Sequence, residues 1–150
     1  MEAQQSLGFI EAVTKAISQY RNYEGRSRRS EYWWFCLAEI LVDLILGTIF
    51  YIFQQINLSI LIYIMYAVYL VCEIIIFIIG LPLAIRRLHD VGKSGWFLLL
   101  AFIPFVNLYL IYLFVCDSQK EENEYGPSPK YSGADPSNLT GAGANYQNMA

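Results

Sequence analysis

Charge is almost absent from the middle of this 150-residue chain. Between Tyr32 and Cys116, most of the charged residues fall in one short interval, Arg86 to Lys93, which separates two long apolar runs. A water-soluble fold would instead scatter charges over every exposed helix face. The sequence therefore predicts an all-α integral membrane protein, in agreement with a composition that is 56% hydrophobic and only 15% charged.

The apolar runs predict a helical bundle with three transmembrane helices within a membrane domain at residues 23–116. Residues 33–53 and 58–85 each supply the ~20 apolar residues that cross a hydrocarbon core of ~30 Å. A third run at 96–116 is interrupted by Pro104, which could instead mark a re-entrant hairpin. We expect three full spans, and the hairpin is the alternative.

Segments of a different character flank this membrane domain. Within residues 1–22, apolar side chains such as Ile10 and Ile17 recur at helical spacing, which predicts one amphipathic helix. This helix could lie in the lipid headgroup region or pack on the ends of the spans. Residues 117–150 begin with an acidic stretch and continue rich in Gly, Ser, Asn and Pro, so we expect a disordered polar tail.

The basic residues predict the orientation of the chain. Seven of them flank the spans, in Arg21–Arg29 and Arg86–Lys93, whereas none lies in the turn at 54–57. Because Lys and Arg near the ends of spans stay on the cytoplasmic side, both segments and the N-terminus are expected there. Three full spans would then place the tail on the opposite side, and a re-entrant hairpin would return it to the cytoplasm.

Four motifs occur in order along the chain. They are Gly25-Arg26-x-Arg28-Arg29-x-Glu31-Tyr32-Trp33, Arg86-Arg87-Leu88-His89-Asp90-x-Gly92-x-Ser94-Gly95-Trp96, Ile103-Pro104 and Glu122-Asn123-x-Tyr125-Gly126-Pro127. On these motifs, from about residue 23 to 129, the chain resembles the bacterial membrane family catalogued as domain of unknown function 805. The resemblance implies a multi-pass protein of the bacterial inner membrane with a small helical bundle. It implies no activity.

Three acidic residues, Glu39, Asp43 and Glu73, lie inside the predicted spans. A charged group at the centre of a spanning helix costs at least ~2.5 to 3.5 kcal/mol, so such residues usually face a bundle interior and find a partner or a proton. The helical rise places Asp43 and Glu73 at comparable depths, where they could meet. They could share a proton or bind a cation in a small oligomeric transporter or channel, or they could only hydrogen-bond within the bundle.

The predicted cytoplasmic segments contain the candidate binding residues. Basic groups beside a membrane contribute on the order of 1 kcal/mol each toward anionic lipid. The candidate lipid- or partner-binding residues are Arg26, Arg28, Arg29, Glu31, Trp33, Arg86, Arg87, His89, Asp90, Lys93 and Trp96. Alternatively, they serve only as topology determinants and an aromatic belt. Glu31 could pair with an arginine of the other segment, and Asp90 could pair with Arg86 or Arg87 or accept backbone N–H groups in the turn.

The sequence offers no catalytic constellation. His89 and Asp90 fall short of the three or four ligands of a zinc site, and there is no phosphate loop or dinucleotide fingerprint. We therefore expect no enzyme activity and no cofactor. We also expect no nucleic-acid partner, because the basic stretch continues directly into a hydrophobic span and so lies next to lipid phosphates. The expected function is a non-enzymatic module that binds anionic lipid or a membrane protein, including a second copy of itself; the alternative is the transporter or channel.

Overall fold

The computed structural model describes residues 5–55 and 59–131, and over these residues every regular element is a helix. In chain order they are α1 (Phe9–Ser18), α2 (Arg29–Gln55), α3 (Ser59–Asp90), the 3₁₀-helix η1 (Gly95–Phe102) and α4 (Asn107–Val115). The all-helical fold class is confirmed. A helix also forms within residues 1–22, where one was expected.

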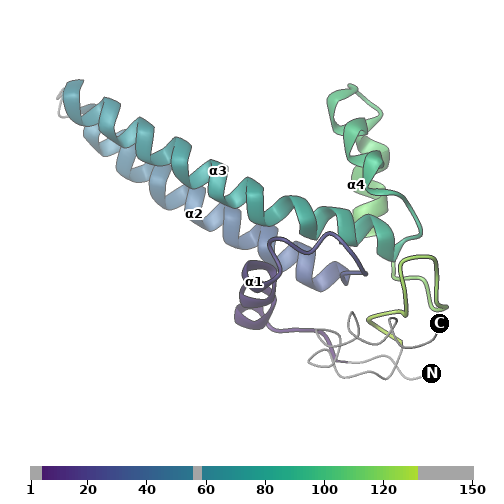
Figure 1. Cartoon of the computed structure of the whole chain (residues 1–150). Helices are drawn as coiled ribbons and strands as arrows, with labels where there is room; N and C mark the ends of the chain where they lie inside the picture. The colour runs from purple at the N-terminus through teal and green to yellow at the C-terminus, as the bar shows by residue number, and fades with distance from the viewer. Residues whose placement is uncertain (1–4, 56–58, 132–150) are drawn as a thin grey trace.

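The longest helices, α2 and α3, form an antiparallel hairpin that projects away from the rest of the molecule (Figure 1). At ~1.5 Å per residue they are about 40 and 48 Å long, which exceeds a hydrocarbon core of ~30 Å. They are the two helices in the described part of the chain that are long and apolar enough to cross a membrane. The predicted spans at 33–53 and 58–85 fall within this hairpin.

The third apolar run does not form the single helix that we expected over residues 96–116. It forms η1, a turn, and α4, which returns along η1 as a second, shorter hairpin (Figure 1). Pro104 accounts for the break, because Ile103 before it is extended (φ −103°, ψ 113°), as the proline ring requires. Phe105 then has a φ of 66°, which reverses the chain. The alternative reading, a hairpin, matches the observed backbone.

The polar ends of both hairpins meet in one region, which we call the base and define as residues 19–31, 83–94 and 113–131. Almost all buried apolar side chains lie in or beside it. They are Ala12, Ala16, Phe35, Leu83, Leu88, Leu110, Leu113 and Phe114. The prediction of a disordered tail is wrong for residues 117–131, which pack into the base; residues 132–150 lie outside the described residues.

Candidate functional site

Asp90, the last residue of α3, lies at the centre of the base and is completely buried. Its Oδ1 accepts a hydrogen bond from Arg26 Nε at 3.1 Å. Its Oδ2 accepts from Arg87 Nη1 at 2.8 Å and from the Ser118 hydroxyl at 2.5 Å. Of the partners considered for Asp90, Arg87 is therefore confirmed. Arg26, Arg87 and Asp90 form a buried ionic cluster in which two guanidinium groups share one carboxylate.

The remaining donors of Arg87 bind the C-terminal end of α4. Nη2 donates to the backbone carbonyls of Leu113, Phe114 and Cys116, and Nε also donates to Phe114. The last carbonyls of a helix have no partners within it and carry partial negative charge, so a guanidinium suits them. Arg87 thus ties the end of α4 to the end of α3, and both ends of residues 95–116 lie in the base.

Arg26 holds the tail in a similar way. Its Nη1 donates to the carbonyls of Glu121 and Gly126 at 2.9 and 3.1 Å. Its Nη2 donates to the carbonyls of Gln119 and Asp90 at 2.6 and 3.2 Å. The planar guanidinium, with five N–H donors, satisfies several backbone groups at once. One side chain therefore fixes residues 119–126 against the end of α3.

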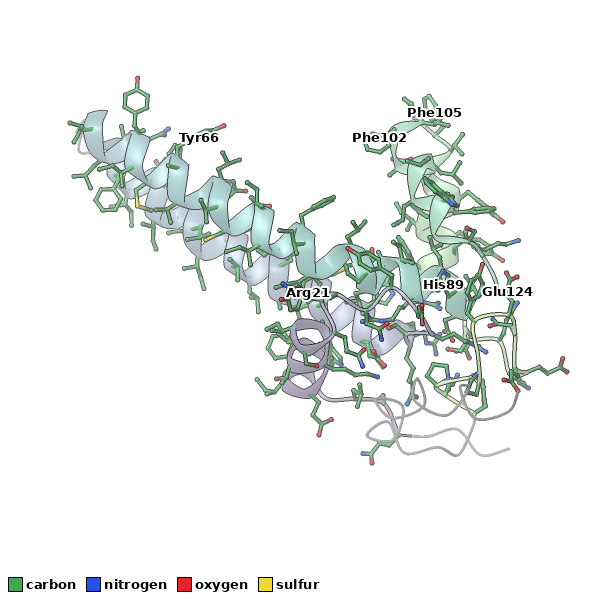
Figure 2. All side chains as sticks on the ribbon, viewed as in Figure 1. Arg21, Tyr66, His89, Phe102, Phe105 and Glu124 are labelled. Carbon is green, nitrogen blue, oxygen red and sulfur yellow. The ribbon has the colours of Figure 1, made fainter. Side chains whose placement is uncertain are left out.

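His89 completes the connection between the motifs. Its Nδ1 lies 3.1 Å from the carbonyl oxygen of Gly25, and its ring stacks on Tyr125 with the centroids 3.7 Å apart. The side-chain amide of Asn123 donates to the carbonyl of His89 at 2.9 Å. Figure 2 shows His89 at the end of α3, close to Glu124 of the tail. The first, second and fourth sequence motifs therefore fold into one polar cluster.

Glu31 and Arg86 anchor the N-terminal part of the chain. Arg86 donates to the hydroxyl of Ser27 at 2.9 Å and to the carbonyls of Gln19 and Asn22. Glu31 is buried and pairs with Lys15 of α1 at 2.8 Å, not with an arginine of the other segment. Lys15 takes this position because α1 packs directly beside the start of α2.

Most of the predicted binding residues are not available on the surface. Seven of them are buried: Arg26, Arg28, Glu31, Arg86, Arg87, His89 and Asp90. The expected exposed surface of six cations does not form, because carbonyls at helix and loop ends take up most of the arginine donors. Four residues remain accessible: Arg29, Trp33, Lys93 and Trp96.

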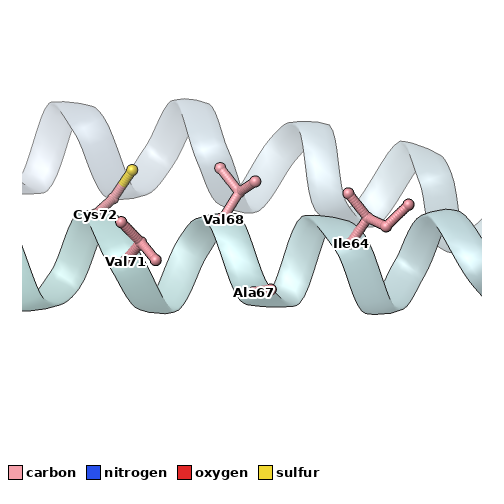
Figure 3. Close-up of a pocket in the computed structure, with 5 residues that line it drawn as sticks. All are labelled: Ile64, Ala67, Val68, Val71 and Cys72. Atoms are coloured by element: carbon pink, nitrogen blue, oxygen red, sulfur yellow. The ribbon is translucent and has the colours of Figure 1, made fainter.

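The structure brings Asp43 of α2 and Glu73 of α3 together, and Glu39 lies one turn nearer the base. Asp43 and Glu73 each keep one buried carboxyl oxygen without a hydrogen-bond donor in the described part of the chain. Elsewhere on α3, Ile64, Ala67, Val68, Val71 and Cys72 line a shallow apolar hollow (Figure 3). Its lining offers no group for polar recognition, which is typical of a surface that faces lipid.

Comparison with known proteins agrees with this architecture. Residues 20–127 match the family model described as "Protein of unknown function (DUF805)". The chain is 35% identical over 116 residues to Inner membrane protein YhaI of Escherichia coli (strain K12), covering 77% of this chain and 92% of that protein. It is 33% identical over 119 residues to Inner membrane protein YhaH of the same strain, covering 77% and 93%. No solved structure matches.

The matched region contains the whole of α2, α3, η1 and α4, together with the base that joins them. Its relatives are bacterial inner membrane proteins, and its two longest helices have the length and composition of spans. The resemblance seen in the sequence motifs is confirmed. This chain belongs to the DUF805 family, whose members are membrane proteins of unknown function.

Proposed function

We propose that the protein is a non-enzymatic module of the inner membrane with two spans, α2 and α3, and a re-entrant hairpin, η1–α4. The observation that supports this topology is the contact of Arg87 with the carbonyls at the end of α4. Since Arg87 lies at the end of α3, the hairpin enters and leaves on the same side. The seven basic residues beside the spans favour the cytoplasm for this side, so the N-terminus, base and tail are cytoplasmic.

The dimensions of the hairpin suit half a bilayer. With 8 residues in η1 and 9 in α4, the helices are about 16 and 14 Å long, against a hydrocarbon core of ~30 Å. Phe102 and Phe105 at the tip are 83% and 86% exposed (Figure 2). In the turn, Ile103 donates to Leu100 and accepts from Asn107, while Pro104 has no N–H. These bonds satisfy part of the backbone of the turn, as lipid favours.

Three elements at the edge of the base, α1 and the first turns of α2 and η1, suit the headgroup layer of a membrane. α1 buries Ala12 and Ala16 against the protein and exposes Ile10 and Ile17, so two of its larger apolar side chains point away from the protein. An interfacial helix has this arrangement. Exposed tryptophans lie at the start of α2 and of η1, where the apolar hairpins leave the base. Tryptophan is enriched at this level of a membrane.

In this location the module binds anionic headgroups through the accessible cations, Arg29 and Lys93. Arg29 lies one helical turn before Trp33 in α2, where it also faces Asp117 at 3.8 Å, and Lys93 lies three residues before Trp96. A basic group beside the membrane contributes about 1 kcal/mol toward an anionic surface. The binding is weaker than six exposed cations would give. It nevertheless places two positive charges at the headgroup level, while Arg26, Arg28, Arg86 and Arg87 are buried within the base.

A lipid-retention experiment tests this function. The full chain and its Arg29→Gln/Lys93→Gln variant are released from vesicles and the retained phosphatidylglycerol is measured by native mass spectrometry. We expect retention to fall about tenfold in the variant, as a loss of about 1 to 2 kcal/mol requires. Lys120→Gln, which removes the charge of an exposed tail residue, is the control. Equal retention by wild type and double variant would contradict the proposal, as would an equal loss in the control.

A second candidate function is transport by an oligomer through Asp43 and Glu73. It is favoured by the meeting of these two carboxyl groups, each with an oxygen that lacks a donor. A shared proton would satisfy both oxygens. Two spans cannot enclose a pathway alone, so several copies would have to line it. Asp43→Asn/Glu73→Gln should then abolish proton flux into vesicles, and absence of flux in the wild type would exclude this candidate.

A further inference from the structure

The helices of this molecule are distributed unevenly along the direction of the spans. Both hairpins leave the same base, but α2 and α3 are about 40 and 48 Å long whereas η1 and α4 are only about 16 and 14 Å. The half of the molecule next to the base therefore contains four helices, and the far half contains only α2 and α3 (Figure 1). α1 adds further width at the level of the base.

We infer that the protein occupies more area in the cytoplasmic leaflet than in the opposite leaflet, and therefore favours membranes whose cytoplasmic leaflet is convex. This inference rests on the proposed function, which places η1–α4 in that leaflet. A helix with its side chains is about 10 to 12 Å across, so two additional helices displace lipid from one leaflet only. Interfacial helices that add area to one leaflet bind in a curvature-sensitive way for the same reason.

The occupant of the exposed hairpin surface is the acyl-chain layer of the cytoplasmic leaflet. This surface is apolar and exposed along η1, where Trp96, Leu99 and Phe102 are 79%, 55% and 83% exposed, and it adjoins α3 at its root. Gly95 at the start of η1 lies so close to Ile85 of α3 that a Cβ there would come within 2.9 Å of a methyl group. Phe97 and Leu98 then pack against the buried cluster of Leu88, Leu110, Leu113 and Phe114. From this junction the apolar surface runs outward along η1 to the exposed tip.

The η1–α4 hairpin is also held to α2 and α3 at both ends, so it adds a fixed area to one leaflet. Its first helix is capped by Ser94, whose hydroxyl accepts from the backbone of Trp96. Near its other end, the ring of Tyr32 stacks on Phe114 at 4.4 Å, and Trp33 Nε1 donates to the carbonyl of Phe114 at 3.3 Å. Together with Arg87, these contacts hold both ends of the hairpin to α2 and α3. The inserted area is consequently a fixed property of the fold.

The test measures protein density on small and large vesicles of phosphatidylethanolamine and phosphatidylglycerol. Lys120→Cys, in a chain whose three native cysteines are serine, is labelled from outside with an impermeant dye, so that only copies with an outward base are counted. For these copies the leaflet of the hairpin is the convex outer one. We expect about twofold higher density per lipid on the small vesicles.

Two variants distinguish a curvature preference caused by the inserted hairpin from an effect of exposed apolar side chains in general. Phe102→Ser/Phe105→Ser makes the tip polar and withdraws it from the leaflet, so the density ratio should fall toward one. Ile60→Ser/Tyr63→Ser removes side chains that are also highly exposed, 73% and 76%, but lie on α3 far from the base. This control should keep the wild-type ratio, because it leaves the hairpin in place.

Three results would overturn the inference: equal wild-type densities, the same ratio in the tip variant, or a cross-link between two copies through Phe102→Cys. The cross-link would mean that a second copy, not lipid, covers the tip. A different result would contradict the proposed topology: reaction of Lys120→Cys with an impermeant reagent from the periplasm of intact cells. An even distribution over vesicles together with a cytoplasmic Lys120 would overturn only the curvature preference.

Discussion

The base and the far part of the α2–α3 hairpin have opposite distributions of polarity. In the base, Arg87 and Asp90 are completely buried. Along the hairpin, Ile40, Leu44 and Ile60 are 60%, 65% and 73% exposed. A water-soluble protein would be unstable with charges inside and such side chains outside. The hairpin is stable where lipid covers it, whereas the base is held together by hydrogen bonds between defined partners.

This difference implies that the two regions respond differently to the same substitution. Lipid tails are as apolar as leucine, so few side chains on the hairpin surface have irreplaceable neighbours. In the base, each buried ionic or polar group depends on particular donors and acceptors, and the loss of one leaves another unpaired. Matched pairs of substitutions, one in each region, therefore test the comparison.

The largest effect is expected for Asp90→Asn. It leaves Arg26 and Arg87 buried without their carboxylate, and breaking a buried ion pair in this way costs about 3 to 5 kcal/mol. Asp43→Asn makes the same chemical change within the hairpin, where a neutral side chain is easier to keep in hydrocarbon. Unfolding in detergent, followed by tryptophan fluorescence, should show a large loss of stability for the first variant and none for the second. Equal losses would remove the distinction between the regions.

Arg87→Lys should release the η1–α4 hairpin from the base. Lysine keeps the charge but cannot reach Asp90 and the end of α4 together, so we expect a loss of about 1.5 to 3 kcal/mol in the local closing free energy. Alkylation of Cys116 should accelerate about 10- to 100-fold, with Cys36 as the internal reference. Arg29→Lys is the exposed control. If Arg29→Lys accelerates the alkylation of Cys116 equally, the hydrogen bonds of Arg87 are not what holds the hairpin to the base.

Two glycine substitutions should have effects of opposite sign. Gly92 follows α3 with a φ of +69°, where an L-residue costs about 1 to 2 kcal/mol, so Gly92→Ala should destabilise the base. Gly47 lies within α2 with open space where its Cβ would be, so Gly47→Ala should stabilise the helix by about 0.5 to 1 kcal/mol. Unfolding temperatures provide the measurement. A stabilising Gly92→Ala would show that the turn is not fixed by the base.

The smallest effect concerns the pH dependence of the tail. Its hydrogen bond to Asp117 raises the pKa of Lys130 above 10.5. Partial burial would raise the pKa of Asp117, but hydrogen bonds from Lys130 and the Ser118 N–H outweigh it and lower this pKa below 3.8. The stabilisation by Asp117 is thus lost as pH falls through its lowered pKa, and that by Lys130 as pH rises through its raised pKa.

Between these extremes neither Asp117 nor Lys130 changes its charge, so the contribution of this pair to the attachment of the tail should not vary. The side chains of Asp117 and Lys130 are 44% and 17% exposed, so salt screens the effect and its size is small. Fluorescence anisotropy of a dye at Lys120→Cys should fall at both pH limits, where the pair is lost and the tail moves more freely. Asp117→Asn removes the acid step; persistence of that step in the variant would assign it to another group.

The sequence was sufficient to predict the long hairpin but not the short one. α2 and α3 follow from two long apolar runs joined by an uncharged turn, a pattern with one simple solution in a bilayer. The run at 96–116 is equally apolar whether the chain crosses or returns. Pro104 marked the break in this run. The return of the chain, however, depends on contacts of Arg87 with backbone carbonyls. Every residue has a backbone carbonyl, so the sequence does not show which ones the arginine binds.

The base was only partly predictable for a related reason. Arg87 and Asp90 are three residues apart on one helix, so their pairing could be read from the sequence. Arg26 lies 64 residues from Asp90, and basic residues beside spans usually determine topology, so its buried role was missed. One available signal was the motif at 122–127 within a tail of otherwise disordered composition. A defined motif there indicates that this part of the tail is packed.

The most direct test of the central claim is the side of the membrane on which residue 120 lies. Lys120→Cys and, as the reference in the last turn of α2, Gln54→Cys are made in a chain without its native cysteines and treated with an impermeant thiol reagent in intact cells. We predict that Gln54→Cys reacts at once and that Lys120→Cys reacts only after the inner membrane is permeabilised. Reaction of Lys120→Cys in intact cells would mean that residues 96–116 cross the membrane, and would contradict the common base of the two hairpins.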